Sequence, residues 1–279
     1  MIRTAGSRRL KVVALVLPLL FLVLVTTPAH AQLATCAELP DHATLKAALD
    51  AAVLAETSGL NLQMWATIVD RGGTVCAVAF SGVNRAAQWP GSRVISAQKA
   101  NTANSFNLDS SAASGAATTG LALSTANLYT AVQPGGSLFG LQESNPVNTL
   151  AAYGNAGDEV NYGTPSDFMR GKKIGGVNVF GGGLALYGAG KVVKGGLGVS
   201  GDTSCADHMI AWRIRKLLAL DHLRGVFGVS GDPNRPDNII YDITKPGKSQ
   251  AVDEKSEGGF GHPTCINTAD PSTLPPVVN

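Results

Sequence analysis

The chain has 279 residues, of which 44% are hydrophobic and 6% aromatic, with 22 basic and 20 acidic side chains. This length suits one substantial core or two small ones. The nearly balanced charge excludes a strongly basic protein of the kind that binds nucleic acid or an anionic membrane surface.

The first 31 residues have the layout of a secretory signal peptide. Four basic residues lie within the first eleven positions, an uncharged apolar run covers residues 12–25, and an Ala-His-Ala triplet ends at Ala31. The apolar run is shorter than the roughly 20 residues of a membrane-spanning helix, although an uncleaved anchor is the alternative. Cleavage after Ala31 leaves 18 basic against 20 acidic side chains. We therefore expect a secreted or periplasmic protein with no membrane attachment after cleavage.

The first half of the mature chain predicts a helix, a pair of strands and a second helix. Residues 41–58 predict a helix that Asp41 caps. Residues 64–69 and 74–80 are apolar runs, and the Asp-Arg-Gly-Gly sequence between them is typical of a hairpin turn. Residues 92–106 predict the second helix.

The pattern weakens from residue 108 to 171, where Pro and Gly breakers recur, and we expect a folded insertion or a lid. Residues 184–187 and 192–200 then predict a β-hairpin, which leads into a helix over residues 204–220 that Ser204 caps. The hairpin is rich in glycine, which indicates that a backbone or a ligand packs closely on its surface.

The last part of the chain is polar and broken by proline. Residues 238–243 can add one edge strand, and we expect the last dozen residues to be loose. We predict one domain over residues 32–230, followed by an extended tail over residues 231–279. The order of elements predicts an α+β fold in which an antiparallel sheet of about five strands is flanked by helices.

Four cysteines in the mature part predict disulfides, because thiols oxidise in an exported protein. We expect Cys205 to pair with Cys265, which ties down the tail, and Cys36 to pair with Cys76. The alternative is a zinc site. Cys205-x-x-His208 and His262-x-x-Cys265 supply two thiols and two imidazoles at spacings that zinc ligands use.

Several segments together resemble the GlcG/HbpS family of haem-binding domains. They are Val69-Asp70-x-Gly72-Gly73, the AQKANTANSF helix around Lys99, Gly175-Gly176-Val177, and residues 193–201 with the helix that follows. The resemblance covers about residues 42–106 and 174–220. It implies a profilin-like α/β sandwich, a homo-oligomer, and binding or degradation of haem. The long segment before Gly175 and the tail depart from the family pattern, so its ligand positions do not carry over directly.

Haem binding needs an apolar slot, an axial donor and cations for the propionates. An axial donor can be His, Tyr, Met or Cys, and the candidates in the mature chain are His42, His208, His222, His262, Tyr129, Tyr153, Tyr162 and Tyr187. His208, near the start of a helix, is the axial candidate, and His262 comes close to it if the Cys205–Cys265 bridge forms. Both imidazoles have a structural alternative, as hydrogen-bonded residues fixed by the crosslink.

Two charged residues are candidates for a second function. Lys99 can hold a carboxylate as a point charge, or act with Asp70 as an acid/base pair in an enzyme for a small carboxylated metabolite. The alternatives are a solvated lysine and a turn aspartate. A third possibility for the whole chain is a structural oligomerisation module.

The backbone amides from Gly198 through Ser200 to residue 203 offer an anion cradle ahead of the last helix. This run matches neither a phosphate-binding loop nor a dinucleotide fingerprint. The nucleophile elbow of serine hydrolases would need glycine at position 202, which is Asp202. The sequence therefore favours an exported haem- or tetrapyrrole-binding protein over a serine hydrolase.

Overall fold

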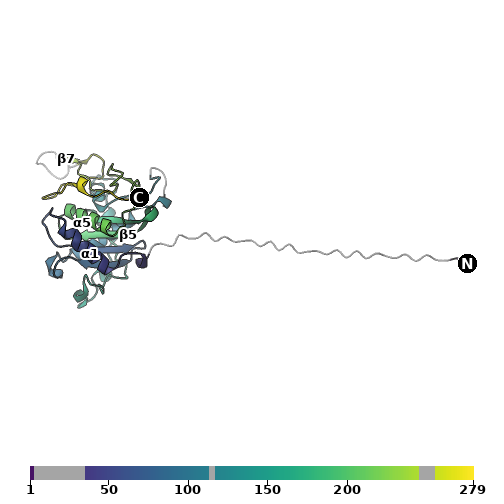
Figure 1. The fold of residues 1–279 in the computed structure, drawn as a ribbon, viewed down its shortest axis with the longest axis horizontal. Coiled ribbons are helices and arrows are strands. Elements are labelled where there is room, and N and C mark those ends of the chain that lie inside the picture. The colour runs from purple at the N-terminus through teal and green to yellow at the C-terminus, as the bar shows by residue number, and fades with distance from the viewer. Residues whose placement is uncertain (3–34, 113–116, 245–254) are drawn as a thin grey trace. The chain divides into compact units, whose positions relative to one another are not determined.

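The centre of the computed structural model is a four-stranded antiparallel sheet (Figure 1). Its strands lie in the order β2-β1-β5-β4. Their bounds are β1 Trp65–Asp70, β2 Val75–Phe80, β4 Gly183–Gly188 and β5 Val192–Ser200. The two hairpins that the sequence predicts thus lie side by side, with β1 against β5. The predicted α+β class is confirmed, and the main sheet has four strands.

Helices cover both faces of this sheet. α2 (Ser92–Ser105) packs on one face, and α1 (His42–Leu54) and α5 (Ser204–Leu217) pack together on the other (Figure 1). Every residue of β1 and β4 is buried. Alternate β1 side chains enter two different apolar clusters, because successive residues of a strand point to opposite faces.

The glycines of β5 allow α2 to lie close against the sheet. A Cβ on Gly198 would lie 1.9 Å from the carbonyl oxygen of Ser96, and one on Gly196 would lie 2.1 Å from that of Ala100. Any side chain here would push the helix away from the strand. The surface that the sequence assigned to a backbone or a ligand is therefore filled by the backbone of α2.

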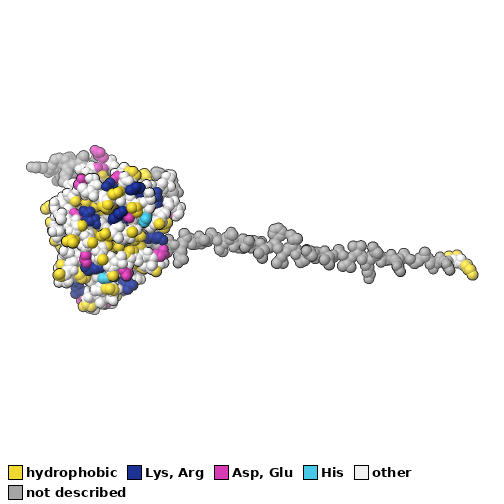
Figure 2. Space-filling model, in the orientation of Figure 1, with side chains coloured by type: hydrophobic (Ala, Val, Ile, Leu, Met, Phe, Trp, Pro, Cys, Tyr) yellow, Lys and Arg dark blue, Asp and Glu magenta, His cyan; other side chains and the backbone are white. Residues whose placement is uncertain are grey.

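The structure describes residues 1–2, 35–112, 117–244 and 255–279, and Leu33–Asn279 form one compact unit. The predicted signal peptide, residues 1–31, lies almost wholly outside the described residues. In the described part of the chain, no helix has the length and hydrophobicity needed to cross a membrane. Figure 2 shows basic, acidic and hydrophobic side chains interspersed over the described part of one face.

Over its described residues, 108–112 and 117–171, the long segment before β4 contains short elements only, and these pack against the main unit. Within it, Ala126, Leu128 and Ala152 are buried. Short strands pair outside the main sheet, β3 Leu121–Ala122 with β6 Phe227–Gly228 and β7 Ile243–Thr244 with β8 Lys255–Ser256, and two short α-helices are α3 Leu128–Ala131 and α4 Thr149–Tyr153.

The C-terminal residues pack onto α5, so the prediction of a loose end is wrong. Leu274 and Val277 are fully buried. The indole Nε1 of Trp212 donates to the carbonyl oxygen of Pro275 at 3.0 Å. Apolar side chains spaced three residues apart in a proline-rich segment can dock on a helix without forming regular structure, and this gives no periodic signal.

Three predicted boundaries shift. α1 ends at Leu54 instead of continuing to residue 58. The cap of α5 is Thr203, whose hydroxyl accepts from the backbone N–H of Ala206, so Ser204 is the first helical residue. The edge strand that the sequence predicts over residues 238–243 is β7 in the structure, and it begins at Ile243.

Candidate functional site

Lys99 lies in a closed polar cluster between α2 and the start of α5. Its Nζ is 2.6 Å from Oδ2 of Asp207 and donates to the carbonyl oxygen of Val199 at 2.9 Å. The ring of Phe180 lies 4.4 Å away, and both charged side chains are fully buried. Burial lowers the pKa of Lys99 and raises the pKa of Asp207 to about 6, while their mutual attraction opposes both shifts.

Asp70 has different partners from Lys99. Its Oδ1 accepts from the backbone N–H of Thr74 at 2.8 Å, and its backbone carbonyl accepts from Gly73, which has φ +82°. These bonds close the turn between β1 and β2. The structure therefore gives the proposed acid/base pair two separate environments, with Lys99 bonded to Asp207 and Asp70 bonded within its own turn.

His208 lies on the buried side of α5. Its side chain is fully buried, and the backbone N–H of Ile239 donates to Nε2 at 3.2 Å. Burial lowers the pKa of His208 to about 4. The side chain of Asn238 contacts the same ring nitrogen at 3.2 Å. A ligand could reach Nε2 only by displacing the backbone at residues 238–239.

His262 lies at the start of α5 and bonds to different groups. Its Nε2 is 2.9 Å from Oγ of Ser204, and its Nδ1 is 2.7 Å from the carbonyl oxygen of Pro263. The ring of Tyr129 packs 5.0 Å away, centroid to centroid. Burial lowers the pKa of His262 to about 4, so this imidazole is neutral at pH 7.

The amides ahead of α5 bond within the protein. Val199 N–H donates to the carbonyl oxygen of Gly182 at 2.8 Å, and Asp202 N–H donates to Oδ1 of Asp207 at 3.0 Å. Ser200 is 3% exposed and pairs with Trp65 in the ladder of β1 and β5. The predicted anion cradle at Gly198 and Ser200 is thus filled by α2 and by protein carboxylates.

Both predicted disulfides are present. Cys36 bonds to Cys76 and Cys205 bonds to Cys265. Because the cysteines pair and His208 bonds to residues 238–239, the four-ligand zinc arrangement does not form in this state of the protein.

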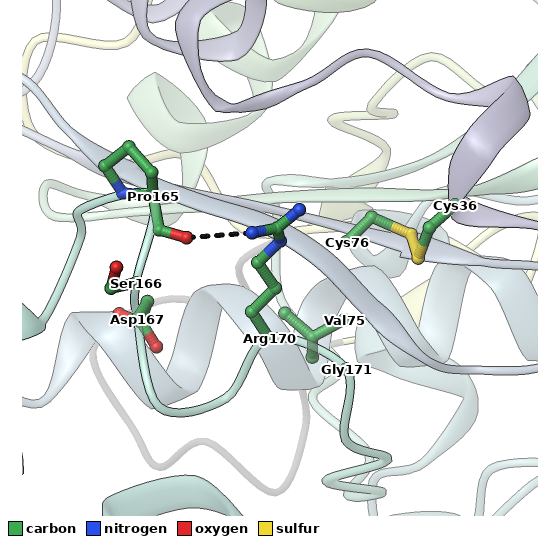
Figure 3. A pocket seen from close by; sticks show the side chains of 8 residues that line it. All are labelled: Cys36, Val75, Cys76, Pro165, Ser166, Asp167, Arg170 and Gly171. Atoms are coloured by element: carbon green, nitrogen blue, oxygen red, sulfur yellow. Dashed lines mark hydrogen bonds between the residues drawn. A yellow bond between two sulfur atoms is a disulfide. The ribbon is translucent and has the colours of Figure 1, made fainter.

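An open cavity lies beside the Cys36–Cys76 disulfide (Figure 3). It has a volume of about 510 Å³, within the range of small-molecule sites. β2 supplies one wall and the segment after Gly163 supplies the other. We name it the Arg170 cavity, and its lining residues are Cys36, Val75, Cys76, Pro165, Ser166, Asp167, Arg170 and Gly171.

The charges around the Arg170 cavity favour an anion. The carboxylate of Asp167 is buried and bonded to the guanidinium of Arg93, with 2.9 Å between Nε and Oδ2. Arg170 is exposed, and its Nη1 donates to the carbonyl oxygen of Pro165 at 3.1 Å (Figure 3). Since Arg93 neutralises Asp167, the guanidinium of Arg170 gives the lining a net positive charge.

The pattern of the sequence pointed to Cys36 and Cys76, but not to the other residues of this cavity or to two buried ion pairs. Arg93 pairs with Asp167, and Arg215 pairs with Asp237, with 2.9 Å between Nη2 and Oδ1. Arg170 stands in an Arg-Gly-Lys-Lys run that could have drawn attention as a cationic segment. The partners of the buried arginines are distant in sequence and gave no such signal.

Comparison with known proteins gives one family. The model described as "Haem degrading protein HbpS-like" matches residues 41–215. The comparison with curated proteins finds no match.

The solved structures that are similar to the chain include the following three. The Klebsiella pneumoniae protein ORFY, of family DUF336, has 23% identity and a TM-score of 0.40, over 64% of this chain and 90% of that one. A PduOC:heme complex has 23% identity and a TM-score of 0.39, over 63% of this chain and 89% of that one. A double mutant of Streptomyces reticuli HbpS has 16% identity and a TM-score of 0.37, over 63% of this chain and 83% of that one.

Proposed function

Because the chain belongs to the HbpS-like family of haem-degrading proteins, we propose that it binds haem or a related tetrapyrrole after export. The observation that carries this proposal is the family match over residues 41–215, which includes the main sheet, α1, α2 and most of α5. The two disulfides and the signal-like first 31 residues support an exported location. Binding, storage, sensing and degradation are all open to a protein of this kind.

We place the ligand in the Arg170 cavity. Pro165 and the Cys36–Cys76 disulfide give the lining apolar surface, and Arg170 gives it an exposed cation. A tetrapyrrole has an apolar ring and carboxylate side groups, and guanidinium groups bind carboxylates through two parallel hydrogen bonds. The volume of about 510 Å³ matches a ligand that is partly enclosed and partly in contact with water.

The lining does not fit the iron of haem. It contains no His, Tyr or Met, and its two cysteines bond to each other. The axial candidate from the sequence, His208, is fully buried and bonded to Ile239. We therefore propose recognition through the carboxylates and the ring, with no side chain of this cavity on the iron.

Titration of the processed chain with hemin and with iron-free protoporphyrin tests this proposal. We expect tryptophan fluorescence to report similar affinities for the two, since the iron makes no bond to the cavity. Arg170→Glu should weaken both at least about tenfold, because it replaces a charged hydrogen-bond donor with a like charge. The matched control is Arg85→Glu, at an exposed arginine outside the cavity, which should bind like the unchanged chain.

Two results would contradict the placement. One is binding by Arg170→Glu that equals that of the unchanged chain. The other is tight binding of hemin, with a shifted Soret band, when protoporphyrin does not bind, because this pattern requires a protein ligand to the iron. Loss of that band in His208→Ala would then move the site to α5.

The alternative of a metabolite enzyme depends on Lys99 and Asp70. Lys99 is fully buried and bonded to Asp207, and Asp70 is bonded within its turn. No contact on these residues favours catalysis, so the tetrapyrrole proposal stands alone. We also propose, from the family, that the protein forms a homo-oligomer, which light scattering of the purified chain measures.

A further inference from the structure

The Cys205–Cys265 disulfide lies beside an imidazole. Both sulfur atoms and a ring nitrogen of His262 lie within 4.8 Å of one another. The two cysteine Cα atoms are 6.0 Å apart. His262 and Cys265 come from the tail, beyond the residues 41–215 that the family model matches. The tail therefore brings to the start of α5 a set of donors that the matched region does not have by itself.

His262 is oriented as a metal-binding histidine would be. Its Nδ1 lies 2.7 Å from the carbonyl oxygen of Pro263, a bond that Nδ1–H donates. The lone pair is then on Nε2, which accepts from the hydroxyl of Ser204 at 2.9 Å. Metal-bound histidines usually donate their other ring N–H to such an oxygen, which fixes both the tautomer and the ring.

The sulfur of Cys265 lies beside a backbone hydrogen-bond donor and a serine hydroxyl. The backbone N–H of Cys205 donates to its Sγ at 3.2 Å, and the hydroxyl of Ser204 lies 3.7 Å from it. The sulfur of Cys265 therefore lies at the first turn of the 14-residue helix α5, whose dipole favours negative charge at its N-terminus. Cys265 and Ser204 are half-buried, so a reductant or an ion can approach from the solvent side.

We propose that reduction converts this disulfide into a zinc site formed by Cys205, Cys265 and His262. An external dithiol supplies two electrons and two protons to the sulfur atoms and leaves as its own disulfide. One Zn²⁺ then displaces the two thiol protons and takes the lone pair of Nε2. Two thiolates and one imidazole suit zinc, and the fourth tetrahedral position stays open to water or to Ser204. The site forms under reducing conditions and is absent when the disulfide is closed.

The other disulfide provides an internal comparison. Cys36, Cys76 and Asp70 also bring three donor atoms within 4.8 Å. There the third donor is a carboxylate, which already accepts from the backbone N–H of Thr74. A carboxylate tied into a turn is less free to rotate onto a metal than Nε2 of His262, whose partner is a single serine hydroxyl. We therefore expect the metal to bind at Cys205, Cys265 and His262.

Cobalt(II) titration of the anaerobically reduced chain, after removal of the dithiol, tests the proposal. We expect one Co²⁺ per chain, with sulfur-to-cobalt charge-transfer absorption and the visible bands of a four-coordinate ion. Zinc should abolish these bands and release two protons per chain. His262→Ala should weaken binding at least about tenfold. The matched control, Asp70→Ala, should bind cobalt like the unchanged chain, and so should Arg170→Glu.

Circular dichroism of the same samples measures whether the reduced chain remains folded. If reduction unfolds the chain, zinc must restore the helical signal in the unchanged chain and fail to restore it in His262→Ala. The proposal is overturned by absence of charge-transfer bands, by equal binding in His262→Ala, by loss of binding in Asp70→Ala, or by a reduced chain that zinc does not refold.

Discussion

The surroundings of the two disulfides differ. At Cys205–Cys265 the neighbouring His262 is buried and lies 2.9 Å from the hydroxyl of the half-buried Ser204, at the start of α5. At Cys36–Cys76 the sulfur atoms line the open Arg170 cavity. One disulfide therefore joins the tail to the start of α5, and the other forms part of the wall of a cavity. We expect changes at the α5 end to act mainly on stability, and changes in the Arg170 cavity to act mainly on binding.

The largest expected effect is that of Lys99→Met. It leaves the fully buried carboxylate of Asp207 without its cation. Breaking a buried ion pair from one side costs about 3–5 kcal/mol. Denaturant unfolding measures this loss, and Lys99→Met with Asp207→Asn should recover part of it. A single Lys99→Met variant as stable as the unchanged chain would show that this cluster is open to water.

The pH dependence of stability comes next. Folding lowers the pKa of His208 and of His262 to about 4, so between about pH 4 and 6.5 the unfolded chain binds protons on both that the folded chain does not. Their contribution is complete above 6.5 and is lost as pH falls. Asp207 acts oppositely, because its folded pKa is raised to about 6 and its contribution is lost as pH rises.

With two histidines against one carboxylate, stability should rise with pH from about 4.5 to 6. His262→Gln should reduce this slope, because one of the two histidines then no longer contributes to it. Unfolding curves at several pH values measure the slope. An unchanged slope in His262→Gln would mean that this imidazole titrates normally in the folded protein.

A smaller effect is expected for Gly198→Ala. The added Cβ would lie 1.9 Å from the carbonyl oxygen of Ser96, so α2 must shift, at a cost of about 1–3 kcal/mol. The control is Gly91→Ala, where an added Cβ meets nothing within 4 Å and stability should change by less than about 1 kcal/mol. Equal stability of the two variants would contradict the close packing of α2 on β5.

The smallest effect on stability is expected in the Arg170 cavity. Arg170→Ala removes an exposed side chain, whose partner is a backbone carbonyl in contact with solvent. The free energy of unfolding, measured by thermal unfolding, should change by less than about 0.5 kcal/mol. A larger loss would mean that Arg170 holds the segment after Gly163 in place, and the contrast between the two ends would then fail.

Local patterns in the sequence were enough for much of the fold. The two hairpins, the positions of α1, α2 and α5, and the fold class follow from periodicity, turn residues and caps within a few positions of each element. The pairing of cysteines also followed, since the tail had to be tied to the body. The glycines of β5 indicated a close neighbour, although not which one.

The tertiary structure decided the partners. Lys99 pairs with Asp207, 108 positions away, and Arg93 pairs with Asp167, 74 positions away. The sequence predicted Asp70 as the partner of Lys99 because both residues lie in motifs that resemble those of the family. In the structure, the carboxylate of Asp70 instead bonds within the β1–β2 turn. The Arg170 cavity likewise depends on a segment without regular structure that lies against β2.

What the sequence by itself determined is therefore the set of elements, the crosslinks and the family. Which charged groups are buried, which remain exposed and where a ligand can enter depend on how those elements pack. The physical reason is that propensities, caps and turns act between neighbours in the chain. Burial and ion pairing depend on residues that meet after the chain has folded.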